Sequence, residues 1–205
     1  MNYDAGKNII NAFKVVKNTY KNVSKLHDHF KTYRGKYRLV IDNFVRWRSD
    51  VDYEAWLING FYFLFQCTED QQFENNGWFD GPLFAVHISF WHECEEPTLR
   101  FIKYEYSDMA SWQNHTWSIG SHGQLNDPFL PQKGFRASEL LENGIRQILI
   151  TDKEISRKYW SLTKVQFVEM PLLLLTKENC DQTLEREFDR LRSGGQQTGS
   201  LSAEK

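Results

Sequence analysis

Cysteine, proline and long apolar runs are scarce in this chain of 205 residues. The cysteines, Cys67, Cys94 and Cys180, lie far apart without a CxxC pair, which argues against a disulfide framework and fits a reducing compartment. The longest apolar clusters, at 61–65 and 172–175, are much shorter than the roughly 18–20 residues that cross a bilayer. The first residues also lack the basic and apolar segments of a secretory signal. We therefore expect a cytoplasmic protein that makes no use of a membrane.

Several motifs of common enzyme classes are absent as well. The chain contains no GxxxxGK[ST], no GxGxxG after a predicted strand, no GxSxG and no HExxH. These absences exclude, at the level of motifs, P-loop nucleotide binding, a dinucleotide fold, a serine hydrolase of the α/β type and a zinc protease. The sequence accordingly predicts no cofactor, except for a divalent metal under the alternative function described below.

The residues that are present indicate a folded domain. Hydrophobic residues make up 40% of the chain and aromatic residues 15%, which is enough to bury a sizeable core. The patterns predict an α+β fold, a single domain over 1–192 with a mainly antiparallel sheet of five or six strands. An N-terminal amphipathic helix and two further helices complete it, and the Gly/Ser/Gln-rich residues 193–205 are expected to form a flexible tail.

Charge is distributed unevenly along the chain. Residues 1–38 carry a net charge of +7, residues 39–131 carry −10 and residues 132–205 carry +1. A basic segment next to an acidic one is typical of a chain that contacts nucleic acid or docks on an acidic protein surface. Because the centre of the chain is acidic, we favour a protein partner slightly over a nucleic acid.

Apolar residues at alternating four- and three-residue spacing predict a basic N-terminal helix within 1–34, over about residues 5–31. Three roles fit this pattern: packing on a core, pairing with a second copy as a homodimer through residues 9–30, or contact with nucleic acid through its lysines. The stripe consists of Ile9, Phe13, Val16, Tyr20, Val23, His27 and Phe30, and the lysines that flank it include Lys14, Lys17 and Lys21.

Alternating apolar and polar residues predict the strands of the sheet, and caps and helical spacing predict the later helices. Strands are expected at 37–48, 83–92, 98–107, 161–169 and 172–175, with a further buried element ending at Cys67; helices are expected at 137–150 and 180–192.

The strands 83–92 and 98–107 are predicted to form a hairpin that is symmetric about residue 95. This register pairs Val86 with Tyr104 on an apolar face and His87 with Lys103 on a polar face. The polar face also carries Glu105, opposite Ala85.

This polar face supplies the candidate catalytic residues. His87 and Glu105 would act as an acid/base pair, and Lys103 would stabilise a developing anion. Asp80 and His92 are candidate metal ligands, because a carboxylate and an imidazole suit a divalent cation. Under this alternative the protein is a small hydrolase or nuclease that acts on a phosphodiester.

Arginine and aromatic side chains supply the candidate binding residues. Arg46, Trp47 and Arg48 are consecutive, and Trp91 lies near the end of a predicted strand. Aromatic and arginine side chains dominate protein-binding hot spots and also stack on the bases of single-stranded nucleic acid. The leading hypothesis is therefore a cytoplasmic binding or regulatory protein that recognises a macromolecular partner through its basic helix and an aromatic-rich, acidic sheet.

Overall fold

The structure is a computed structural model that describes residues 5–40, 45–47, 58–74, 77–90, 95–109, 125–130 and 133–194. Contacts divide the chain into two compact units, residues 1–34 and residues 35–205. The second unit, called the body below, has an antiparallel sheet with helices, and the α+β class predicted from the sequence is confirmed. Most of the predicted flexible tail, from residue 195 onward, lies outside the described residues.

The first unit contains the helix α1, Ala5–Thr32. The prediction of a long amphipathic helix is confirmed, because apolar side chains recur every three or four residues over its whole length. In the part of the chain that the structure describes, no helix is both long enough and apolar enough to cross a membrane.

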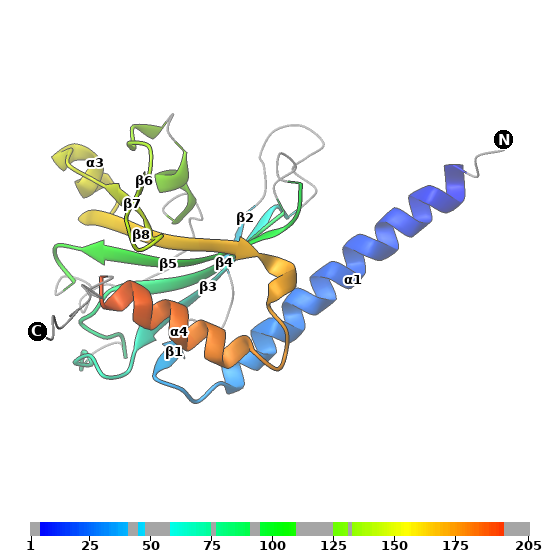
Figure 1. The fold of residues 1–205 in the computed structure, drawn as a ribbon, viewed down its shortest axis with the longest axis horizontal. Helices are drawn as coiled ribbons and strands as arrows, with labels where there is room; N and C mark the ends of the chain where they lie inside the picture. Colours follow the sequence, from blue (N-terminus) through cyan, green and yellow to red (C-terminus); the bar gives the residue numbers. More distant parts are fainter. Residues whose placement is uncertain are drawn as a thin grey trace, which may run out of the picture. The chain divides into compact units, whose positions relative to one another are not determined.

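The body is built on one sheet in which every pair of neighbouring strands is antiparallel (Figure 1). Within the described residues the sheet has eight strands, more than the five or six predicted, in the order β1-β3-β4-β5-β8-β7-β6, with β2 also pairing with β3. The strands are β1 (Tyr37–Leu39), β2 (Val45–Trp47), β3 (Gly60–Cys67), β4 (Leu83–Ser89), β5 (Thr98–Tyr106), β6 (Glu139–Leu140), β7 (Arg146–Leu149) and β8 (Leu162–Pro171).

Both faces of the central strands are buried. On one face, the helix side, α4 (Cys180–Arg192) lies against the sheet and inserts Phe188 among aromatic rings of β1, β3, β4 and β5 (Figure 1). On the other face, the loop side, an apolar core includes Tyr159, next to the short helix α3 (Lys153–Lys158). This core also contains Tyr62, Leu64, Leu83, Ala85, Ile102, Tyr104, Leu125, Phe135, Ile148, Val165 and Phe167.

The predicted strand 37–48 is divided into two pieces that share one neighbour. β1 pairs with residues 65–67 of β3, and β2 pairs with residues 60–62. The two pairings are out of register by three residues, which agrees with the position of Asn43, where the apolar and polar alternation of the sequence is broken. Residues 41–44 themselves lie outside the described part.

The helix predicted over 137–150 is wrong, because this segment forms the hairpin of β6 and β7. Asn143-Gly144 makes its turn: the Asn143 side chain accepts a hydrogen bond from the Ile145 N–H, and Gly144 has a φ of 74°. The strand predicted at 172–175 is also wrong, since Leu172–Leu174 forms a 3-10 turn. The helix predicted at 180–192 and the strands at 83–92, 98–107 and 161–169 are confirmed with small changes of their ends.

The register predicted for the β4–β5 hairpin is wrong as well. The structure pairs His87 with Arg100 and Phe84 with Lys103, three residues away from the symmetric register. Since side chains alternate between faces, an odd shift changes which residues of the two strands share a face. Val86 and Tyr104, predicted to face one another, are both buried but on opposite faces of the sheet.

The substitution Gly144→Ala distinguishes the observed hairpin from the predicted helix, because its effect on stability has opposite signs in the two structures. In a helix interior this change would stabilise the protein by about 1 kcal/mol, but at a positive φ it should destabilise it by a similar amount. The added Cβ would also lie 3.1 Å from Arg190 Nη2. We expect urea denaturation to show a lower stability for Gly144→Ala and a smaller loss for Gly144→Asn, since asparagine tolerates the left-handed conformation. A gain of stability with alanine would contradict the turn.

Candidate functional site

The predicted catalytic residues do not form one site. His87 lies on the loop side of the sheet with Tyr62 and Arg100, its partners on β3 and β5. Lys103 and Glu105 lie on the helix side, because they are an odd number of residues from Arg100 along β5. The sheet therefore separates the imidazole from the ammonium and carboxylate groups that were expected to act with it.

A row of polar and aromatic side chains crosses the loop side of the sheet. Strand pairing places Tyr62 beside His87, His87 beside Arg100, and Arg100 beside Glu169. The Tyr62 and His87 rings are stacked, with centroids 4.0 Å apart and an angle of 3° between their planes. Arg100 forms an ion pair with Glu169, and Tyr62 Oη donates a hydrogen bond of 2.9 Å to Asn126 Oδ1.

His87 is the buried titratable group of this row. Neither ring nitrogen has a hydrogen-bond partner within the described structure, and the Oγ1 atom of Thr98, farther along the same face, is also unpartnered. Burial lowers the pKa of His87 well below its ordinary value of 6.5, and the positive charge of Arg100 lowers it further. The imidazole is therefore neutral at pH 7. A Cβ atom on Gly60 would lie only 2.8 Å from His87 Nε2, so this glycine makes room for the ring.

Lys103 and Glu105 form a charge cluster of their own on the helix side. Glu105 accepts from Lys103 Nζ and from Lys164 Nζ, both at 2.8 Å. Burial lowers the pKa of Lys103, and the contact with Glu105 offsets part of this effect. Burial raises the pKa of Glu105, but the hydrogen bonds from both lysines outweigh it, so that the pKa lies below its usual range. One carboxylate thus compensates two ammonium groups, which is the arrangement of a structural ion cluster.

Of the two candidate metal ligands, the structure describes only Asp80. Asp80 is exposed in the loop between β3 and β4, and it belongs to no group of three potential ligand side chains there. His92 lies outside the described residues.

The candidate binding residues are distributed over both units. Lys14, Lys17 and Lys21 are exposed on α1, and Arg46 is exposed on β2. The side chains of Trp47, Arg48 and Trp91 lie outside the described part. The aromatic residues of β3, β4 and β5 mostly fill the two cores, so these described rings offer no exposed contact surface; they include Tyr62, Phe63, Phe65, Phe84, Phe101 and Tyr104.

Comparison with known proteins adds no information about this site. No family model, no curated protein and no solved structure matches the chain.

The row of Tyr62, His87, Arg100 and Glu169 was missed in the sequence because its members come from four strands. Each residue sits in a local pattern that is typical of a strand, and only the register across the sheet brings them together. In Phe61-Tyr62-Phe63 only the middle ring carries a hydroxyl group, and side chains at alternate positions of a strand lie on opposite faces. The sequence therefore indicates that one face of β3 is more polar than the other at this point.

The lowered pKa of His87 predicts acid sensitivity. The unfolded chain binds a proton at this histidine near pH 6.5, whereas the folded chain does not, so stability is complete above this pH and falls as the pH drops below it. His87→Phe keeps a ring on Tyr62 and removes the titration. Chemical denaturation at pH 7.5 and pH 5 should show that the substitution removes up to about 2 kcal/mol of the loss between the two conditions. An unchanged pH dependence would contradict a buried, neutral imidazole.

The charge cluster predicts unequal effects for its two central members. Glu105→Gln leaves the buried Lys103 ammonium without a carboxylate and should lower the free energy of unfolding by roughly 1–3 kcal/mol. Lys103→Met removes the buried charge and leaves Glu105 paired with Lys164, so stability should stay equal or rise. Urea denaturation of the two variants at pH 7.5 checks this order, and a larger loss for Lys103→Met would show that Lys103 contributes more than a compensated charge.

Proposed function

We propose that this protein is a binding protein that recognises a protein partner through α1. The observation that carries the proposal is the exposure of large apolar side chains on this helix: Ile9 is 59% exposed and Phe13 is 73% exposed. Ile10 and Val15 are exposed to a similar degree. Contiguous exposed apolar groups usually mark an interaction surface.

The free energy available from covering this surface supports a protein partner. Burying one large apolar side chain completely contributes about 1.5–3 kcal/mol, so a partner that covers Ile9 and Phe13 gains several kcal/mol from these two residues alone. A nucleic acid would satisfy the lysines but would leave Ile9 and Phe13 in water, since its affinity comes mainly from phosphate contacts. The exposure of Ile9 and Phe13 is therefore better explained by a protein partner than by a nucleic acid.

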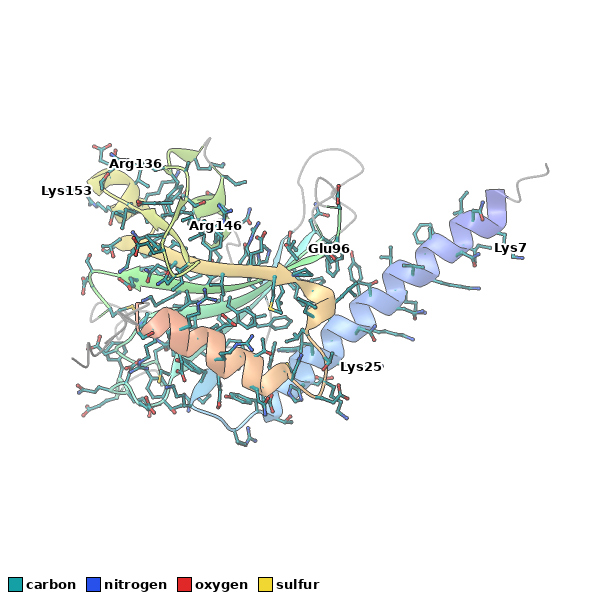
Figure 2. All side chains as sticks on the ribbon, viewed as in Figure 1. Lys7, Lys25, Glu96, Arg136, Arg146 and Lys153 are labelled. Carbon is teal, nitrogen blue, oxygen red and sulfur yellow. The ribbon has the colours of Figure 1, made fainter. Side chains whose placement is uncertain are left out.

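The spacing and charge of α1 define the chemistry of that partner. Apolar residues at four- and three-residue spacing fit the groove between the ridges of another helix. Residues 5–32 contain six lysines and one aspartate, and Figure 2 labels Lys7 and Lys25 among them. An amphipathic partner helix with acidic flanks complements this charge, whereas a second copy would bring two sets of lysines together. The proposed partner is thus an acidic, amphipathic helix of another protein.

Site-specific photocrosslinking in the producing cells tests this proposal. A benzophenone amino acid at position 13 lies on the apolar stripe, and the same group at position 18 lies on the opposite side of the helix and serves as the control. We expect a discrete protein adduct from position 13 that is absent from position 18 and is lost when Ile9→Asp is added. Equal crosslinking from both positions would contradict recognition through the stripe.

Two measurements on the purified chain distinguish the proposed partner from a second copy of the chain and from a nucleic acid. Light scattering after size exclusion would reveal a homodimer that depends on Phe13, and fluorescence anisotropy would reveal binding of duplex DNA or single-stranded RNA. If nucleic acid binds, loses affinity steeply with salt, and responds to Lys14→Glu and Lys17→Glu but not to Phe13→Asp, the protein-partner proposal is wrong.

A further inference from the structure

The hairpin of β6 and β7 opens at its base. Its strands pair at only two positions, Glu139 with Gln147 and Leu140 with Arg146. Beyond them β7 continues along β8 as far as Leu149, while residues 134–138 leave the sheet. Continued pairing in this register would have placed Ala137 opposite Leu149, but the chain does not close there.

This opening leaves backbone groups at the C-terminal end of β7 without a neighbouring strand among the described residues. Ile150 N–H donates to Thr163 O of β8 at 2.9 Å, so the peptide groups of Ile150 point into the sheet. Groups on alternate residues of an antiparallel strand point to opposite sides, and the N–H groups of Leu149 and Thr151 therefore point toward the opening. Neither donates a hydrogen bond to another described residue. The segment is a short sheet edge of the kind that another extended chain can pair with.

A pocket lies in the same opening. Its volume is about 360 Å³, within the range of sites that hold a ligand group. Phe135 and Ile155 give it an apolar interior, and Phe135 is fixed there by an edge-to-face contact with Tyr159 at 4.9 Å. The lining consists of Gly134, Phe135 and Arg136 from one side of the opening, Leu149, Ile150, Thr151 and Asp152 from the other, and Ile155 from α3.

The pocket lining holds one carboxylate, Asp152, and one guanidinium, Arg136, and they differ in how far they are already engaged. The Asp152 carboxylate already accepts hydrogen bonds from the N–H groups of Glu154 and Ile155, as the N-cap of α3. Arg136, by contrast, is exposed and makes no ion pair with a described residue. Figure 2 shows Arg136 and Lys153 at this end of the body. Among the described residues that line the pocket, the one cationic group is the Arg136 guanidinium.

We propose that the opened hairpin is a receptor for an extended, acidic peptide segment of a partner protein. The peptide adds a strand along Leu149–Thr151, inserts one apolar side chain beside Phe135 and Ile155, and places a carboxylate against Arg136. Backbone pairing supplies affinity without regard to sequence, while the pocket and the arginine select the side chains. This site is separate from the helix surface proposed above, and neither proposal requires the other.

Selection of peptides on the full chain, from a random library displayed on phage, provides the probe. We expect the enriched peptides to share an apolar residue with an acidic residue near it. Arg136→Glu should weaken the binding of the best synthetic peptide about tenfold or more, whereas the matched charge change Lys133→Glu, at an exposed lysine outside the pocket lining, should not. Phe13→Asp on α1 should leave this binding unchanged, which keeps the outcome separate from that of the helix proposal.

Backbone pairing is tested by methylating single amide nitrogens of that peptide. Methylation should reduce affinity about tenfold at the residues whose N–H faces β7 and have little effect at alternate residues, which face away. Leu149→Pro should also abolish binding while the protein stays folded by circular dichroism, because this N–H is not part of the β7–β8 ladder.

Three results would overturn the proposal. Binding that survives both Arg136→Glu and Leu149→Pro would place the peptide elsewhere. Sensitivity to Arg136 without an alternating effect of amide methylation would indicate a site for a small carboxylate rather than a strand. A self-association of the chain that Arg136→Glu abolishes would make a second copy, not a partner protein, the occupant.

Discussion

The packing of Phe188 against the sheet decides how the rest of the body is organised. This ring of α4 contacts Tyr37, Phe65, Phe84 and Phe101, with centroids 5.0–5.7 Å apart. Because these four residues come from four strands, one helical side chain covers the helix side of the sheet at its centre. The loop side has its own core, so the central strands have no solvent face, and polar groups in them are buried whichever way they point.

This double burial explains both polar clusters described above. His87 on the loop side is kept neutral by desolvation and stacks on Tyr62, while Lys103 on the helix side stays compensated by Glu105. Had one face been open to water, each would have been an ordinary surface residue with little influence on stability. The two sides therefore accommodate a buried basic side chain in different ways. On the loop side His87 is kept unprotonated, and on the helix side Glu105 supplies a counter-charge to Lys103.

The same feature limited what the sequence could predict. The strands of the β4–β5 pair and the helices α1 and α4 were predictable, because alternation and helical spacing are local patterns. The register was not predictable, since apolar and polar alternation specifies a register only where one face of the strand meets water, and β4 is buried at every position. In residues 137–150, Leu140, Ile145 and Ile148 fit a helix as well as a hairpin, and the outcome depended on Asn143-Gly144. The predicted grouping of His87 with Lys103 and Glu105 depends on the wrong register, and the structure places them on opposite faces of the sheet. On α1, the exposed Ile9 and Phe13 lie on the predicted stripe, whereas the exposed Ile10 and Val15 lie off it.

The turn of the β6–β7 hairpin is fastened to α4, because the Arg190 guanidinium donates a hydrogen bond to Asn143 O. Arg190 in turn is held by Glu187, a buried residue one helical turn earlier. The hairpin is thus held at its turn by α4 and along β7 by β8, while its two strands do not pair with one another beyond Glu139 and Gln147. Arg190 therefore links the turn of this hairpin directly to the helix that covers the helix side of the sheet.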